Sequence, residues 1–225
     1  LRLAAHFSED VKMIKAFREG RDIHTATAAE INGVKLEDVT KQMRREAKAV
    51  NFGIIYGQGP HGLSEGAGIP YARAKEFIEN YFKVYKGVKE FIDSEIDRAR
   101  ERGFAETLFG RRRYLPEINS SVLQVKKGAE RMAINTPLQG TAADIIKVAM
   151  IGAAQMAANF NTNSHESEKS VRMLLQVHDE LLFEIKEDVV EKVVVKLKEI
   201  MENVIKLKVP IIVDASAGDN WGEMK

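Results

Sequence analysis

Apolar residues recur at helical spacing along most of this chain, and segments rich in glycine, proline or polar residues separate the periodic stretches. Residues 20–30 read as a turn that leads into a short helix. The first eight residues read as the tail of a strand that enters a helix running through Phe17. Further along, the pattern predicts helices over residues 71–82, 88–102, 125–135, 141–159 and 188–207.

Strand patterns are confined to short segments. Residues 104–116 alternate and turn through Gly110, which predicts a small hairpin. Apolar residues 171–177 and 181–185 flank a polar turn and predict a second hairpin, with 210–215 as a strand that returns to this sheet. The polar segment 161–170 reads as an exposed, mobile loop. We therefore expect an α+β fold in which most residues are helical.

One predicted helix combines charge and aromatic rings in an ordered way. It begins after Thr40, a plausible N-cap, and stops at Gly57. A stripe about 18 Å long carries two cations and then two rings, spaced every four residues: Arg44, Lys48, Phe52 and Tyr56. The opposite face carries apolar residues that can dock the helix onto a core: Ala47, Val50, Ile54 and Ile55.

Two cations near the start of a helix oppose its macrodipole unless an anion sits there. With an anion, the free N–H groups, the dipole, Arg44 and Lys48 all attract the same charge. The two rings then offer surfaces for a sugar and a base, so the stripe reads as a nucleotide-binding surface. An ordinary amphipathic helix is an equally common reading of this spacing. Gly53 favours the nucleotide, because a glycine inside a helix costs about 1 kcal/mol and suggests a close approach to the backbone.

The run RREAKAVNFGIIYG, from Arg44 to Gly57, resembles motif B of the family A DNA polymerases, the bacterial DNA polymerase I group. The resemblance implies that Arg44 and Lys48 neutralise the triphosphate of a dNTP, and it makes Lys48 a catalytic residue as well. It also implies that Phe52 faces the sugar and that Tyr56 lies near the base pair. The phrase Asp-Ile-His-x-x-Thr-Ala resembles a segment of the same family whose histidine contacts the triphosphate, which makes His24 a further dNTP-binding residue.

The second hairpin carries two adjacent acids at its tip, Asp179 and Glu180. Acids on a rigid hairpin suit Mg²⁺, although a solvated turn is the commoner reading of Asp-Glu alone. The string Gln176-Val177-His178-Asp179-Glu180 resembles motif C of the family. The resemblance makes Asp179 the catalytic metal ligand, Glu180 its catalytic support, and Gln176 and His178 DNA-binding residues. Strand alternation sends the two acids to opposite faces, so they are not expected to be equal ligands.

Three polar residues, Arg131, Asn135 and Gln139, recur every four positions in an apolar stretch that Pro137 is expected to break or kink. They read either as a structural network between helices or as minor-groove contacts, where similar acceptors on every base pair allow shape checking. The resemblance favours a grip on the primer–template DNA. The segment Thr-x-x-Gly-Arg-Arg-Arg-Tyr-Leu-Pro is also similar to the family, which places Arg111 on the nucleic-acid backbone, although three arginines usually mark a solvated face.

Leu1–Ser8 resembles the end of motif A, whose usual metal-binding Asp and sugar-screening Glu come earlier than this sequence starts. The resemblance therefore implies a fragment of a right-hand polymerase, with residues 1–7 in the palm, 8–125 in the fingers and 126–225 in the distal palm. A two-metal Mg²⁺ site would be completed by an Asp outside the chain. The expected partners are primer–template DNA, a dNTP, and the thumb and upstream palm in the same or a separate chain.

Composition bounds this interpretation without changing it. The 225 residues are 44% hydrophobic and 30% charged, and the formal net charge of +1 requires local basic patches for any polyanion. The absence of cysteine excludes disulfides and thiolate metal sites. The sequence shows no secretion signal and no expected membrane span, which indicates the cytoplasm or an organelle interior.

The function indicated is template-directed DNA synthesis by a nucleotidyltransferase of DNA replication and repair, with dNTP attacked by a primer 3′-hydroxyl. Two alternatives remain open: a non-catalytic primer–template binding fragment, and a single-subunit RNA polymerase. The residue that would select DNA over RNA sugars lies outside the sequence.

Overall fold

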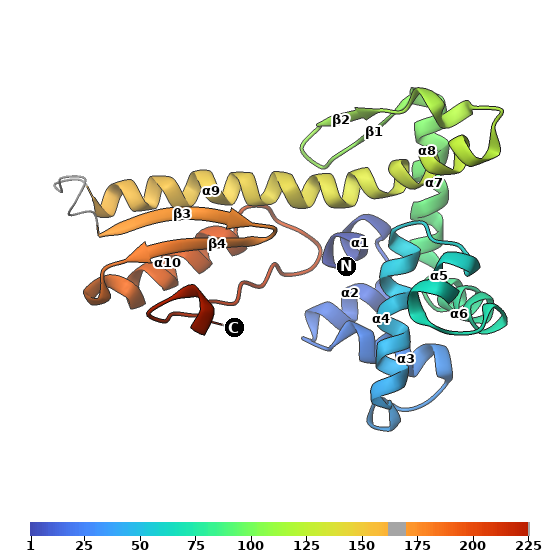
Figure 1. Cartoon of the computed structure of the whole chain (residues 1–225), viewed down its shortest axis with the longest axis horizontal. Helices are drawn as coiled ribbons and strands as arrows, with labels where there is room; N and C mark the ends of the chain where they lie inside the picture. The colour runs from blue at the N-terminus through green and yellow to red at the C-terminus, as the bar shows by residue number, and fades with distance from the viewer. Residues whose placement is uncertain (162–169, 225) are drawn as a thin grey trace. The chain divides into compact units, whose positions relative to one another are not determined.

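The computed structural model describes residues 1–161 and 170–224, which form two compact units (Figure 1). The first unit comprises residues 1–141 and 207–209, and the second comprises residues 142–206 and the segment from 210 onward. The loop predicted over 161–170 lies almost entirely outside the described residues. The α+β prediction is confirmed, because helices dominate and the strands form two small antiparallel hairpins.

The first unit is helical apart from one hairpin, which pairs β1 (Phe104–Glu106) with β2 (Arg112–Tyr114). Short 3₁₀ turns cover Leu36–Asp38 and Pro116–Asn119. The helices are α1 (Arg2–Ser8), α2 (Val11–Arg18), α3 (Ile23–Asn32), α4 (Lys41–Ile55), α5 (Pro60–Ala67), α6 (Tyr71–Val84), α7 (Lys86–Arg102) and α8 (Leu123–Asn135).

Two predictions for this unit were wrong. The first residues form helix α1 and not the end of a strand; α1 ends where Glu9 adopts φ +52°, and Asp10 then caps α2 by accepting hydrogen bonds from its first backbone N–H groups. The sequence of residues 58–62, with Gly59, Pro60 and Gly62, predicts a turn rich in helix breakers, but α5 starts at Pro60. Proline is well tolerated in the first helical turn, because the N–H it lacks has no intrahelical partner there.

The motif B helix, α4, is anchored as its pattern predicted. Thr40 caps it, with its hydroxyl oxygen accepting a hydrogen bond from the N–H of Met43 at 3.2 Å. Val50 and Ile54 enter the main core of the unit, and α3 packs directly against α4. The four apolar residues of the inner face are all buried: Ala47, Val50, Ile54 and Ile55.

The close approach inferred at Gly53 comes from the protein itself. A Cβ there would lie 3.0 Å from Gln58 Oε1 and 3.2 Å from Leu63 Cδ1. The glycine is therefore explained by the packing of the turn after α4 and by α5, and it no longer counts as a sign of a bound nucleotide.

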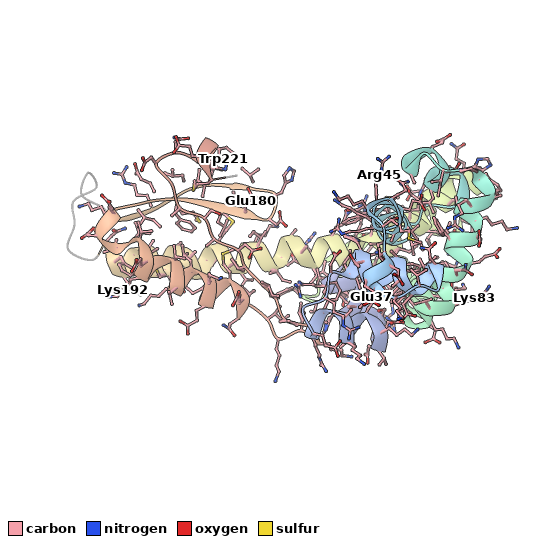
Figure 2. All side chains as sticks on the ribbon, turned by 90° about the horizontal axis from the view of Figure 1, so that it is seen from below. Glu37, Arg45, Lys83, Glu180, Lys192 and Trp221 are labelled. Carbon is pink, nitrogen blue, oxygen red and sulfur yellow. The ribbon has the colours of Figure 1, made fainter. Side chains whose placement is uncertain are left out.

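The second unit packs two helices on one face of a hairpin (Figures 1 and 2). The elements are α9 (Thr141–Phe160), β3 (Val171–Val177), β4 (Glu180–Ile185) and α10 (Val190–Glu202). Ala153 and Met156 of α9 share a core with Val193 and Leu197 of α10 and with Val171 of β3.

The C-terminal helix is shorter than predicted and the final strand is absent. A 3₁₀ turn precedes α10, which ends at Glu202, and in the described part of the chain residues 210–215 pair with no strand. The apolar run after α10 packs elsewhere: residues 207–209 belong to the first unit, and Val209 is buried in its core. A strand reading of 210–215 also fails at Pro210, which has no N–H for a ladder.

Pro137 interrupts α-helical hydrogen bonding without ending the helical stretch. A five-residue π turn, Thr136–Gly140, connects α8 to α9. By length and composition alone, the stretch Leu123–Phe160 could cross a membrane. The same test is passed by core helices, and the buried side chains of Ala153, Met156 and Ala157 on α9 show core packing of this kind.

Gly57 gives a test of how α4 ends. Its φ is +65°, and a Cβ would lie 2.8 Å from Arg131 Cγ, whereas Gly20 has the same φ and open space around it. We expect Gly20→Ala to lower the free energy of unfolding by about 1–2 kcal/mol for the left-handed backbone alone. Gly57→Ala should lower it by about 1–3 kcal/mol more, because Arg131 must also move. Equal losses in urea unfolding would contradict the proposed contact.

Candidate functional site

The predicted stripe lies on the outer surface of α4. Arg44 and Lys48 are exposed and Phe52 is partly buried. Tyr56 is 40% exposed, and its ring lies nearly parallel to that of Phe52, with the centroids 6.3 Å apart. Neighbouring Arg45 also points away from the helices beneath it (Figure 2). Cations and aromatic faces are therefore accessible together, as the spacing predicted.

Arg44 already has an anionic partner. Its Nε donates to Asp22 Oδ2 at 2.6 Å, and its Nη2 donates to Asp22 Oδ1 at 3.3 Å. Asp22 is also the N-cap of α3, accepting a hydrogen bond from the N–H of Thr25. Partial burial alone would raise the pKa of Asp22, but the hydrogen bonds from Arg44 and Thr25 lower that pKa well below its usual range. The carboxylate is thus firmly ionised at neutral pH.

His24 connects α3 to the stripe. Its ring centroid lies 5.7 Å from that of Phe52, and its Nδ1 lies 3.2 Å from Asn51 Nδ2. Burial lowers the pKa of His24; Asp22 raises that pKa, and Arg44 and Lys48 lower it further. The pKa therefore lies below its ordinary value, so His24 is mostly neutral at pH 7.

The sequence did not single out Asp22 and Asn51, although each left a signal. Asp22 precedes a helical pattern and so has the composition of an N-cap. Asn51 is a polar residue on the apolar face of the motif B helix, between Val50 and Ile54. It is fully buried, and buried amides need partners.

Residues of the polar Arg–Asn–Gln stripe lie in different local environments. Arg131 is exposed on α8 and passes over Gly57. Asn135 is the last residue of α8, and its buried Oδ1 has no hydrogen-bond partner among the described residues. Gln139 is exposed in the π turn. An unpaired buried oxygen does not fit the reading of a fully satisfied structural network.

Arg111 is held by the π turn, since its Nη2 donates to Gly140 O at 3.0 Å. Its two neighbours have protein partners as well. Arg112 pairs with Glu106 at 2.5 Å, and Arg113 Nη2 lies 2.8 Å from Met132 Sδ. The arginine run is thus an ordered surface and not a freely solvated one.

In the second unit, the predicted acidic hairpin forms with a two-residue turn, His178-Asp179, between β3 and β4. His178 adopts φ +54°, a left-handed conformation that is uncommon for residues other than glycine. Gln176 Nε2 donates to His178 O and ties down the turn. Glu180 opens β4 opposite Val177 (Figure 2). His178, Asp179 and Glu180 are all exposed.

These residues do not by themselves make a divalent-metal site. Across residues 1–161 and 170–224, no group of three or more His, Cys, Asp or Glu side chains could hold a metal ion. Hard cations such as Mg²⁺ prefer six oxygen ligands, usually one or two carboxylates plus water and phosphates. Asp179 can supply one such ligand from an ordered turn, but a two-metal site needs further acids.

A comparison with protein-family models identifies the family of the chain that carries these residues. The model of DNA polymerase family A matches residues 1–223. This chain belongs to DNA polymerase family A. The predicted resemblance is therefore confirmed over nearly the whole sequence, and with it the relation to the bacterial DNA polymerase I group.

Similar proteins include the thermostable DNA polymerase I of Thermus thermophilus, 47% identical over 98% of this chain and 26% of its own length. DNA polymerase I of Geobacillus stearothermophilus is 46% identical over 100% of this chain and 25% of its own length. A solved structure of the Pol1 POL domain from M. smegmatis, in complex with DNA primer–template and dNTP, matches with a TM-score of 0.91. It is 40% identical and covers 99% of this chain and 38% of its own.

The chain thus spans about a quarter of the length of these relatives. These relatives carry the name DNA polymerase I, which leaves the RNA polymerase alternative without support. The division into fingers at 8–125 and distal palm at 126–225 stays a prediction, because the compact units follow packing and divide near residue 141.

The Asp22–Arg44 pair can be tested by acid. Asn keeps the capping ability of Asp22 but loses its charge, so Asp22→Asn isolates the ion pair. The pKa of Asp22 is lowered by folding, so its contribution to stability is present above about pH 4 and is lost as the pH falls further. We expect the variant to be less stable by up to about 1 kcal/mol at pH 5–7, since the pair is half exposed. In urea unfolding, this difference should shrink between pH 4 and 2; a difference that stays constant would contradict it.

Proposed function

We propose that this chain carries the nucleotide-binding fingers and the distal palm of an enzyme for template-directed DNA synthesis. The reaction is attack of a primer 3′-hydroxyl on the α-phosphate of a dNTP, with pyrophosphate leaving. The observation that carries the proposal is the α4 stripe: exposed cations at its N-terminal half and stacked rings at its C-terminal half, in a member of DNA polymerase family A. The relative from M. smegmatis is in complex with primer–template and dNTP.

In this proposal the triphosphate lies against Arg44, Lys48 and His24. The two cations are exposed on α4, and the His24 ring touches Phe52 of the same stripe. Charge-assisted hydrogen bonds to phosphate oxygens are about twice as strong as neutral ones. Lys48 also has a catalytic role, because a cation beside the leaving pyrophosphate stabilises developing negative charge. Phe52 faces the sugar, and Tyr56 lies near the base pair.

Primer–template DNA is the second proposed ligand. Arg131, Asn135 and Gln139 would contact the duplex in the minor groove, where every base pair offers similar hydrogen-bond acceptors. Arg111 would hold the backbone from the ordered arginine surface. On the hairpin, Gln176 and His178 would contact the primer strand from a turn that their own hydrogen bond stabilises.

Asp179 is proposed to supply a metal ligand for Mg²⁺, with Glu180 as a catalytic support beside it. When bound, the metal would stabilise charge on the transferring phosphoryl group. The missing acid is proposed to come from the upstream palm, in the same or a separate chain. The localisation proposed is the cytoplasm or an organelle interior, where DNA replication and repair take place.

The incomplete acid set also favours a second reading of the isolated fragment: a module that binds primer–template without catalysis. Under both readings the isolated chain does not extend a primer. The readings differ in whether Lys48 and Asp179 take part in synthesis by the complete polymerase, which the following tests measure.

Lys48→Ala in the complete polymerase should weaken use of dNTP far more than binding of DNA. Losing a charge-assisted contact costs about 10- to 100-fold in kcat/KM for dNTP. The Kd for primer–template should change less than about threefold, because one rim cation contributes little to DNA affinity. Lys83→Ala, at an exposed lysine of α6 (Figure 2), is the matched control and should change neither quantity. Equal losses of dNTP use and DNA affinity would contradict the stripe as a nucleotide site.

The 225-residue chain alone should not extend a primer with Mg²⁺ and dNTPs, whereas the complete polymerase should. Asp179→Asn in the complete polymerase should abolish extension while primer–template binding persists, because an amide is a poor Mg²⁺ ligand. Gel assays with a labelled primer measure both. Robust extension by the isolated chain would overturn the two-carboxylate argument.

A further inference from the structure

Four polar side chains form a chain of hydrogen bonds inside the first unit. Thr27 and Asn51 are fully buried, and Tyr85 is 1% exposed. Thr27 Oγ1 lies 3.0 Å from Tyr85 Oη and 3.1 Å from Asn51 Nδ2, and the same Nδ2 lies 3.2 Å from His24 Nδ1. The chain of bonds thus runs from the core to the surface that carries the nucleotide stripe.

The protons in this chain can be counted. Thr27 has one hydroxyl proton, and its shortest contact, 2.7 Å, is with the carbonyl oxygen of Ile23, which only accepts. Thr27 Oγ1 must therefore accept from its other two partners. Tyr85 can donate, because burial raises its pKa to about 12 and keeps its proton in place. Asn51 donates through Nδ2.

The proton count agrees with the orientation of the Asn51 amide in the structure. Nδ2 is the closer of its two polar atoms to Thr27 Oγ1, at 3.1 Å against 3.3 Å for Oδ1, and Nδ2 is also the atom that lies 3.2 Å from His24 Nδ1. With Nδ2 facing Thr27, its first proton goes to Thr27 and its second to His24 Nδ1. The longer contact between Thr27 Oγ1 and Asn51 Oδ1, 3.3 Å, does not compete with these bonds. His24 Nδ1 is therefore an acceptor.

We propose that Asn51 is a positioning residue that fixes His24 as the neutral Nε2–H tautomer, so that His24 meets the triphosphate of the nucleotide as a hydrogen-bond donor. This inference rests on the proposed function, because it takes His24 as a triphosphate contact. Nε2 lies on the opposite side of the ring from the amide, so a proton held there is available to a ligand.

The surroundings of His24 explain why the tautomer matters. His24 is partly buried, and the charged side chains that act on it are Asp22 at the start of α3 and Arg44 and Lys48 on α4. Burial and the two cations disfavour an added imidazolium charge, yet a neutral ring can still donate one hydrogen bond. The other neutral tautomer would turn a lone pair towards a phosphate oxygen. A donor in place of a lone pair changes affinity by about tenfold or more.

The tautomer can be read directly in the 225-residue chain. Long-range ¹H–¹⁵N NMR of histidine-labelled protein at pH 7 distinguishes Nε2–H, Nδ1–H and imidazolium, and His24→Gln assigns the signal. We expect Nε2–H for His24. Either an Nδ1–H tautomer or an imidazolium at pH 7 would overturn the proposal without reference to activity.

A kinetic arm uses the complete polymerase and dCTP opposite a template dG. Asn51→Asp puts an acceptor against His24 Nδ1. In this variant the introduced carboxylate raises the pKa of His24 relative to the unchanged enzyme. At pH 6 the imidazolium still donates from Nε2; at a pH above that pKa, Nδ1–H stays bonded to the carboxylate and Nε2 loses its proton. The KM for dCTP should therefore rise about tenfold relative to the unchanged enzyme between pH 6 and 9, with a smaller change in kcat. Asn80→Asp on α6 adds the same charge away from the stripe and should behave as the unchanged enzyme.

Two further variants separate the inference from the function beneath it. If His24→Ala leaves the KM for dCTP unchanged, the proposed role of His24 fails. If His24→Ala raises that KM but the KM of Asn51→Asp, relative to the unchanged enzyme, does not change with pH, the role of His24 stands and the inference fails. In the double variant His24→Ala/Asn51→Asp, the KM for dCTP should depend on pH no more than in His24→Ala alone, because Asn51→Asp acts through His24. A pH-dependent rise in KM that persists in the double variant would overturn the inference.

Discussion

Burial of one face of α4 determines where its other face points. Val50 and Ile54 are held in the main core of the first unit, and Ala47 and Ile55 are buried beside them. A helix rotated to expose these residues would lose the transfer free energy of several apolar side chains, at roughly 25 cal/mol per Å². The cations and rings on the outer face therefore need no interaction of their own to be oriented. The orientation of the proposed nucleotide surface thus follows from core packing, and its side chains are not needed to hold the helix in place.

The sequence predicted this helix well because its signals are local and periodic. The cap at Thr40, the stop at Gly57 and the four-residue spacing of Arg44, Lys48, Phe52 and Tyr56 all follow from helical geometry. The same holds for both hairpins, whose alternation and turns are local. What could not be predicted depends on distant partners. The run after α10 is apolar in the manner of a helix or strand, yet Val209 is buried in the core of the first unit.

The candidate site shows the same division. Its accessible residues were identified by motif and spacing, whereas the residues that orient them were not. Asp22 and Asn51 act through atoms of residues about 22 and 27 positions away, separations at which no periodic pattern exists. Gly53 illustrates the opposite error: a local signal was assigned to a ligand when Gln58 and Leu63 already occupied the space. Motifs thus locate a surface, but contacts between helices decide how each side chain is presented.

The π turn after α8 affects how the polar residues on this helical stretch are aligned. In an α-helix of 3.6 residues per turn, side chains four apart drift by about 40° around the axis. Hydrogen bonds in a π turn span five residues, so the turn is wider and each residue advances by a smaller angle. A π turn over Thr136–Gly140 therefore opposes the drift that a regular α-helix would give between Asn135 and Gln139.

Asp22 has a consequence for the energetics of any anion that binds α4. Its carboxylate occupies the guanidinium of Arg44 with two hydrogen bonds, in the way that a phosphate would. Arg44 is therefore already ordered before a ligand arrives, so less side-chain entropy is lost on binding. The ligand must in return share the Arg44 guanidinium with the Asp22 carboxylate or displace that carboxylate from it. The net gain when a phosphate binds Arg44 is therefore the difference between two interaction free energies: that of Arg44 with the phosphate and that of Arg44 with the Asp22 carboxylate.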